Sequence, residues 1–245
     1  MNPAPWVLCA GKGGVGTTTL TALMGSEAGL EGARTLLVDG NFGAAGLHRT
    51  FGMMDGHRGL ASLVDRSTTP EDLVLAVGPN LWLVPGGESP EGEPLLSPGQ
   101  RAGTYRRLER IFADFDVVLI DGGSTLDSVL PSVQLDVAGV WTVSVGERIA
   151  MAGAYALLKV LTHSYAGTPV LPLFNRSGPQ EAESLSQTMT GAALRFLRTR
   201  TLAPAYFPNV PELALDGKVT DVLMSDTARA ALSALLPRLA QQTLR

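Results

Sequence analysis

The sequence is poor in cysteine and in lysine. Cys9 is the one cysteine among 245 residues, so the chain can form no intramolecular disulfide and no Cys-rich zinc or iron–sulfur site of its own. A reducing, cytoplasmic setting is the simplest expectation. Lysine occurs at three positions among 19 basic residues: Lys12, Lys159 and Lys218.

The sequence also lacks long hydrophobic runs and an excess of positive charge. No uninterrupted stretch of ~18 apolar residues occurs, and the first residues contain no basic region of a secretory signal. We therefore expect neither a membrane span nor secretion. The formal net charge is −4 and the pI is about 5.4, which argues against a surface built throughout for nucleic acid. Nucleic acid is not an expected partner.

Short apolar runs alternate with longer helical patterns along the chain. The runs predict buried strands at Trp6–Ala10, Thr35–Val38, Leu81–Val84, Val117–Ile120, Val137–Val143, Pro169–Phe174 and Leu202–Phe207. The helical patterns cover about 17–31, 58–66, 100–113, 147–164, 179–199 and 226–244. This alternation predicts one α/β domain over residues 1–245, with a doubly wound, mostly parallel sheet and helices on both faces. A Pro/Gly/Glu-rich surface loop is expected at 85–103.

A glycine-rich loop follows the first strand and precedes a helical pattern. Against the P-loop template G-x-x-x-x-G-K-[ST], Gly11, Gly16 and Thr18 fit, while Thr17 stands at the lysine position. Backbone N–H groups of such a loop bind phosphates, and the Thr18 hydroxyl would face Mg²⁺. The alternative is a turn that binds nothing. The candidate phosphate-binding residues are Gly11, Gly13, Gly14, Val15, Gly16, Thr17, Thr18 and Thr19.

The order Lys12-Gly13-Gly14-Val15-Gly16-Thr17-Thr18-Thr19 resembles the deviant Walker A loop of the MinD/ParA ATPases. The resemblance implies a nucleotide-dependent homodimer in which Lys12 reaches the phosphates bound to the partner. The family normally has a second lysine where this chain has Thr17. The neutral threonine cannot replace that charge, so both nucleotide affinity and hydrolysis are expected to be reduced.

Three further positions match the family's catalytic carboxylates in part. The resemblance places Asp39 near Mg²⁺ and puts Asn41 where related members carry the carboxylate that activates water. An amide can hold a water but cannot take its proton, so weak or absent hydrolysis is expected. Asp121 follows an apolar run and is a candidate Mg²⁺ residue beside Thr18 and Asp39, with a turn or helix cap as the alternative.

Later segments resemble the flagellar-number regulators of the FlhG/FleN type. The segment Tyr155-Ala156-Leu157-Leu158-Lys159 is similar to a helix of that group, and Arg195-Phe196-Leu197 is similar to its Arg-Phe-Leu sequence. Asn175 and Arg176 resemble its adenine-side pair, and Tyr206-Phe207-Pro208-Asn209 is similar to its Ile-Pro-Asp sequence. The resemblance therefore implies that Pro208 also lies beside the nucleotide. The resemblance implies a flagellar GTPase or a transcriptional regulator as partner.

Two functional hypotheses remain open. The first is a nucleotide-responsive dimeric switch that binds ATP or ADP with Mg²⁺ and controls flagellar number or placement with little hydrolysis. The second is a pseudo-ATPase scaffold for another envelope machine, because BcsQ-like regulators of cellulose secretion share this loop; pilus assembly belongs to the same alternative. A reductase similar to the nitrogenase iron protein is excluded because it needs several cysteine ligands.

The final helical pattern carries a leucine stripe at Leu232, Leu235, Leu236 and Leu239. We expect this stripe to pack into the core because few cations flank it, with peripheral contact at the inner membrane as the alternative. The cluster Arg195, Arg198 and Arg200 is expected to be a solvated helix end, with the non-specific DNA binding of the ParA branch as the alternative.

Overall fold

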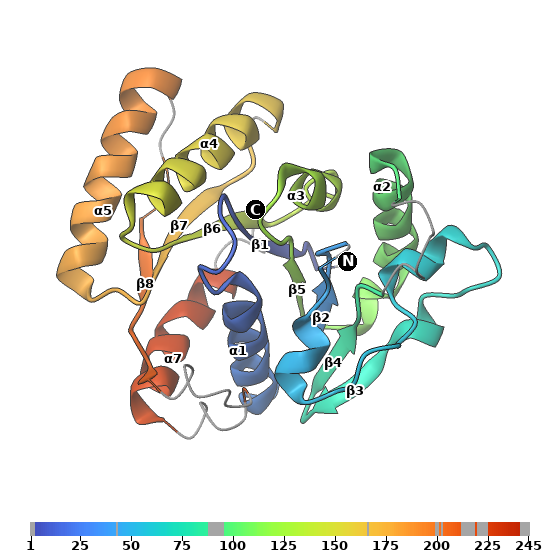
Figure 1. The fold of residues 1–245 in the computed structure, drawn as a ribbon. Helices are drawn as coiled ribbons and strands as arrows, with labels where there is room; N and C mark the ends of the chain where they lie inside the picture. Colours follow the sequence, from blue (N-terminus) through green and yellow to red (C-terminus); the bar gives the residue numbers. More distant parts are fainter. Residues whose placement is uncertain are drawn as a thin grey trace.

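The strand Trp6–Ala10 (β1) lies inside an eight-stranded sheet and is buried along its whole length. The computed structural model describes residues 3–42, 44–87, 96–165, 167–198, 201, 203–211, 219 and 225–240. The strand order is β3-β4-β2-β5-β1-β6-β7-β8, and all neighbours are parallel except β3 and β4 (Figure 1). The other strands are β2 (Thr35–Asp39), β3 (Leu75–Gly78), β4 (Leu81–Val84), β5 (Val117–Asp121), β6 (Gly139–Ser144), β7 (Val170–Asn175) and β8 (Ala205–Phe207).

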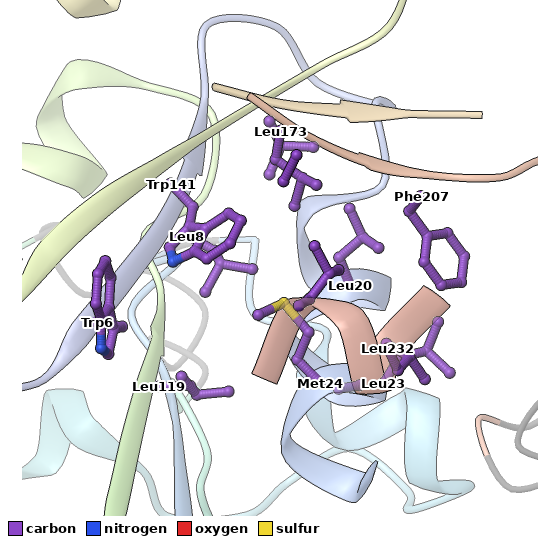
Figure 2. Close-up of a cluster of buried hydrophobic side chains, with 14 of the residues drawn as sticks. Trp6, Leu8, Leu20, Leu23, Met24, Leu119, Trp141, Leu173, Phe207 and Leu232 are labelled. Carbon is purple, nitrogen blue, oxygen red and sulfur yellow. The ribbon is translucent and has the colours of Figure 1, made fainter. Parts of the chain in front are cut away.

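Helices cover both faces of the sheet. On one face, Trp6, Leu8 and Ala10 share a core cluster with residues of α1 (Thr17–Leu30) and α7 (Asp226–Ala240), part of which is drawn in Figure 2. On the other, Val7 and Cys9 share a cluster with residues of α2 (Pro98–Leu108), α3 (Leu126–Ser132), α4 (Arg148–Ser164) and α5 (Pro179–Ala192). This division follows from the alternating direction of side chains along a strand. The predicted fold class is confirmed.

The leucine stripe of α7 packs into the core, as predicted. Leu232, Leu235 and Leu239 are buried, and Leu236 packs against the same cluster. The indole Nε1 of Trp6 donates a hydrogen bond to the carbonyl of Leu239 at 3.0 Å, which ties the end of α7 to β1. Residues 241–244 of the predicted helix, and Arg200, lie outside the described residues. Within the described part of the chain, no helix is both long and apolar enough to cross a membrane.

The helix predicted at 58–66 is wrong. Residues Leu60–Val64 form a short 3₁₀ helix instead. Gly59 is extended, with φ of −144° and ψ of −165°, and the N–H groups of Leu60 and Ala61 donate to the carbonyls of Pro85 and Gly86, at 2.7 and 3.1 Å, so the segment is held against the loop after β4. A tertiary backbone contact therefore overrides the helical pattern.

Several element boundaries also differ from those predicted. The strand β3 and the helix α3 were not predicted. The helix α2 begins inside the predicted loop at 85–103, because Ser97 and Gln100 form a capping box and Pro98 occupies the first turn. Residues 88–95 of that loop lie outside the described residues. The predicted continuation of α5 is a π-helical turn, Ala193–Leu197.

Candidate functional site

The glycine loop between β1 and α1 forms one wall of a pocket of about 370 Å³. Gly14 and Gly16 adopt positive φ angles of 78° and 93°, a conformation that side chains disfavour. The predicted phosphate-binding loop is therefore folded as a loop that needs glycine. The residues that line the pocket are Lys12, Gly13, Gly14, Gly16, Thr17, Thr18, Thr19, Asn41, Gly123, Ser124 and Arg176.

The helix α4 packs directly against this loop. A Cβ atom on Gly11 would overlap the backbone carbonyl of Gly153, and a Cβ atom on Gly153 would lie only 2.5 Å from the carbonyl oxygen of Gly11. The two glycines thus permit a backbone-to-backbone contact between the loop and α4. The position of the pocket wall depends on this contact.

Two buried carboxylates lie at adjacent strand ends. Asp39 ends β2 and is the register partner of Asp121, which ends β5. The Oδ1 atom of Asp121 accepts a hydrogen bond from the Gly123 N–H at 3.0 Å, and the nearby Thr18 hydroxyl lowers the pKa of Asp121. Its Oδ2 atom is buried and has no hydrogen-bond partner among the described residues. Burial and the neighbouring Asp39 carboxylate raise the pKa of Asp121 to about 7.

This arrangement fits a Mg²⁺ ion. A buried carboxylate oxygen without a partner is costly, and a cation would compensate its charge. Mg²⁺ is usually held by one or two carboxylates together with waters and phosphate oxygens. No group of three or more His, Cys, Asp or Glu residues in the described part of the chain could hold a metal by itself, so Thr18 and Asp121 would share the ion with a bound phosphate.

Asp39 holds the loop that follows it. Its Oδ1 accepts from the N–H of Asn41 at 3.1 Å, and its Oδ2 accepts from the N–H groups of Gly46 and Leu47, both at 2.9 Å. Burial raises the pKa of Asp39, although these three hydrogen bonds oppose the increase. Both oxygens are engaged in this geometry, so the Mg²⁺ role of Asp39 stays a prediction.

The side chain of Asn41 lines the pocket. Its Nδ2 donates to the carbonyl of Ala44 at 3.0 Å, and a Cβ atom on Gly123 would lie 2.7 Å from its Oδ1. The amide therefore bridges the loop after β2 and the loop after β5. It can orient a water in the pocket, but it cannot act as a general base.

Asn175 contacts the phosphate loop itself. Its Nδ2 donates to the carbonyl of Val15 at 2.8 Å, and its Oδ1 accepts from the N–H of Arg176 at 2.9 Å. Arg176 lines the pocket, whereas Asn175 is buried behind it. The predicted contact between Asn175 and adenine stays a prediction. Pro208 lines a different pocket, between β8 and α7, and the structure does not bring it to the phosphate loop.

Three residues at or near the pocket were not predicted: Gly123, Ser124 and Glu147. The Nζ of Lys12 lies 2.7 Å from Oε2 of Glu147, the residue before α4. Ser124 lines the pocket opposite Gly13. The short distance between Ser124 and Asp121 in the sequence could have identified Ser124, but no sequence pattern links Glu147 to a lysine 135 residues away.

The chain is similar to known proteins over most of its length. No family model matches it. It is 28% identical over 199 residues to the antiactivator FleN of Pseudomonas aeruginosa, and the match covers 80% of this chain and 71% of FleN. It is 22% identical over 153 residues to the flagellum site-determining protein YlxH of Helicobacter pylori, covering 62% of this chain and 52% of YlxH.

Solved structures show the same fold. The septum site-determining protein MinD from Pyrococcus horikoshii, in complex with Mg-ADP, has a TM-score of 0.76 at 20% identity and covers 98% of this chain and 99% of its own. A ParA family ATPase from Chlorobium tepidum has a TM-score of 0.71 at 17% identity, covering 96% and 98% of the two chains.

Proposed function

Because this chain is a P-loop protein of the MinD/ParA family similar to the FlhG/FleN regulators, we propose that it binds ATP or ADP with Mg²⁺ and regulates flagellar number or placement. The flagellar assignment is supported by the names of the two sequence relatives, an antiactivator and a flagellum site-determining protein. The nucleotide assignment is supported by the pocket and by the Mg-ADP bound to the related fold.

The observation that carries the proposal is the buried Asp121 carboxylate beside Thr18, at the base of a glycine-rich loop. Backbone N–H groups from Gly13 to Thr18 would hold the phosphate chain. Thr18 and Asp121 would hold Mg²⁺, which neutralises phosphate charge when bound. The Oδ2 atom of Asp121, which has no hydrogen-bond partner among the described residues, supplies the oxygen ligand that such an ion requires.

Hydrolysis is weak or absent in this proposal. Thr17 removes a cation from the phosphate site, and Asn41 cannot take a proton from water. The amide of Asn41 is already bound to the carbonyl of Ala44, which further fixes it in a structural role. The protein would then respond to which nucleotide is bound, and it would not depend on rapid turnover.

The switching element would be the pair of loops that meet at Asn41 and Gly123. Asp39 fixes one loop and Asp121 the other, so occupancy of the pocket would order both. We further propose a nucleotide-dependent homodimer in the cytoplasm, in which Lys12 reaches the partner's phosphates. A flagellar GTPase or a transcriptional regulator would bind the dimer as its partner.

Calorimetric titration with Mg·ATP and Mg·ADP tests the nucleotide assignment. Wild-type protein is expected to release heat with both, and Asp121→Ala is expected to lose the Mg²⁺-dependent part. No heat with either nucleotide would overturn the assignment.

The flagellar role is tested in Pseudomonas aeruginosa cells that lack FleN and express this chain. The number of flagella on each cell is counted. Unchanged flagellar number, despite stable expression, would count against a flagellar role.

A further inference from the structure

The pocket has a charge deficit at the position where P-loops carry lysine. Thr17 is neutral, while the phosphate chain of ADP or ATP carries several negative charges. The backbone N–H groups of the loop supply partial positive charge only. Among the described residues that line the pocket, the cations are Lys12 and Arg176.

Lys12 does not remedy the deficit in this geometry. Its Nζ lies 2.7 Å from Oε2 of Glu147, and this ion pair lowers the pKa of Glu147. The carboxylate compensates the ammonium charge locally. The second cation, Arg176, has no hydrogen-bond or ion-pair partner for its guanidinium within the described ranges.

The backbone around Arg176 is held against the phosphate loop. Arg176 has a φ of 57°, in the left-handed region that costs a non-glycine residue energy. The preceding residue, Asn175, holds this geometry by binding the carbonyl of Val15 and the N–H of Arg176. A Cβ atom on Gly16 would overlap the Asn175 amide, so the end of β7 lies in direct contact with the loop.

The charge of Arg176 also acts on the same side of the pocket as Lys12. After the contribution of Lys12, the guanidinium is a further cause of the lowered pKa of Glu147. Arg176 lines the same pocket as the glycine loop, in which a bound phosphate chain would lie.

From this geometry we infer that Arg176 binds the phosphate chain and supplies the charge that Thr17 lacks. The inference rests on the proposed nucleotide binding. A guanidinium can donate two parallel hydrogen bonds to phosphate oxygens, which suits it to this role. The Asn-Arg resemblance implies a base-side role for both residues. Here, however, the Asn175 amide is engaged with the loop, and Arg176 lines the pocket together with residues of the phosphate loop.

Binding constants for a series of ligands test the inference. ATP, ADP, AMP, ITP and tripolyphosphate, each with Mg²⁺, are titrated into wild type, Arg176→Gln and Arg176→Lys. Arg110→Gln, an exposed arginine distant in sequence, is the matched control. We expect Arg176→Gln to weaken ATP, ADP, ITP and tripolyphosphate by about ten-fold or more and AMP by much less. Arg176→Lys should recover part of the loss.

A second variant shows whether Arg176→Gln loses affinity because it removes a positive charge. Adding Thr17→Lys to Arg176→Gln is expected to restore ADP affinity, since it returns a cation to the loop. An equal loss for AMP and ADP, or a loss for ATP without one for ITP, would assign Arg176 to the ribose or base and overturn the inference. Unchanged nucleotide binding by Arg176→Gln would also overturn the inference. A wild-type protein that binds neither nucleotide nor tripolyphosphate would overturn the proposed function together with this role.

Discussion

The ammonium group of Lys12 lies 2.7 Å from the carboxylate of Glu147, so an ion pair joins the phosphate loop to the start of α4. Both side chains are partly exposed, at 38% and 63%. Exposed pairs of this kind contribute little to stability and exchange readily. The pair can therefore open when a stronger anion, such as a partner's bound phosphate, approaches Lys12.

We predict that Glu147→Gln favours the nucleotide-dependent dimer. The substitution removes the anion that competes for Lys12, so the dimer dissociation constant with Mg·ATP should fall by a few-fold. Lys12→Ala should raise it strongly. Sedimentation velocity with and without Mg·ATP measures both. A dimer that is weaker in Glu147→Gln than in wild type would show that Glu147 supports assembly.

The second prediction concerns the pH dependence of stability. The pKa of Asp121 is raised to about 7 in the folded chain, so between pH 4 and pH 7 the unfolded chain has released a proton that the folded chain retains. Asp121 therefore makes the free protein less stable as pH rises through this window, by about 1.4 kcal/mol for each unit of pKa difference.

Asp121→Asn removes this titration. Without Mg²⁺, the free energy of unfolding of the variant should exceed that of wild type by an amount that grows from pH 4 to pH 7 and is constant above it. Saturating Mg·ADP should reduce the difference because the ion stabilises the wild-type carboxylate. Urea unfolding at a series of pH values measures it. A difference that is independent of pH would contradict the raised pKa.

The third prediction concerns turnover. Wild-type protein should release phosphate from Mg·ATP slowly, and Asn41→Asp combined with Thr17→Lys should accelerate release by about 100-fold or more, the typical contribution of a positioned general base. Each single substitution should give less. Steady-state phosphate release measures this, with Thr17→Ser as the control that changes no charge. Rapid release by wild type would show that neither Thr17 nor Asn41 limits hydrolysis.

The sequence predicted the strands whose residues are buried on both faces. β1 and β5 are continuous apolar runs, and such runs are typical of buried parallel strands. β3 was missed because it lies at the sheet edge, where two of its residues are partly buried and two are exposed. Residues 58–66 resemble a helix in their apolar spacing, but contacts with Pro85 and Gly86 decide their structure. Such contacts between distant segments leave no local pattern.

The site was predictable where its residues are consecutive. The phosphate loop is one continuous segment, and Asp39 and Asp121 each follow an apolar strand. The engagement of Asn175 with Val15, the pairing of Lys12 with Glu147 and the contact of Gly11 with Gly153 depend on segments that are more than a hundred residues apart. Only the folded chain shows them.

The fourth prediction concerns the contact between α1 and α7. Glu27 is fully buried on α1, where the Arg229 guanidinium lies 3.3 Å from its Oε1 and the Ser233 hydroxyl lies 3.5 Å from it. Arg229→Met would leave a buried carboxylate without its half-exposed cation, so the free energy of unfolding should fall by about 1–3 kcal/mol. Adding Glu27→Gln should recover part of that loss because it removes the charge. Urea unfolding of the two variants measures the difference, and equal stability of Arg229→Met and wild type would contradict the argument.

The fifth prediction uses two helical glycines in different surroundings. Alanine is favoured over glycine inside a helix by about 1 kcal/mol, so Gly→Ala stabilises a helix wherever the added methyl group has room. Gly191 of α5 has no atom within 4 Å of an added Cβ, whereas the Cβ on Gly153 of α4 would lie 2.5 Å from the Gly11 carbonyl oxygen. Gly191→Ala should therefore raise the melting temperature, and Gly153→Ala should lower it.

The same two variants should differ in nucleotide binding. Because α4 can relieve the overlap only by moving away from the phosphate loop, Gly153→Ala should also weaken Mg·ADP binding, while Gly191→Ala should leave it unchanged. Gly153→Ala protein that is less stable but binds Mg·ADP with wild-type affinity would show that the loop keeps its shape without α4.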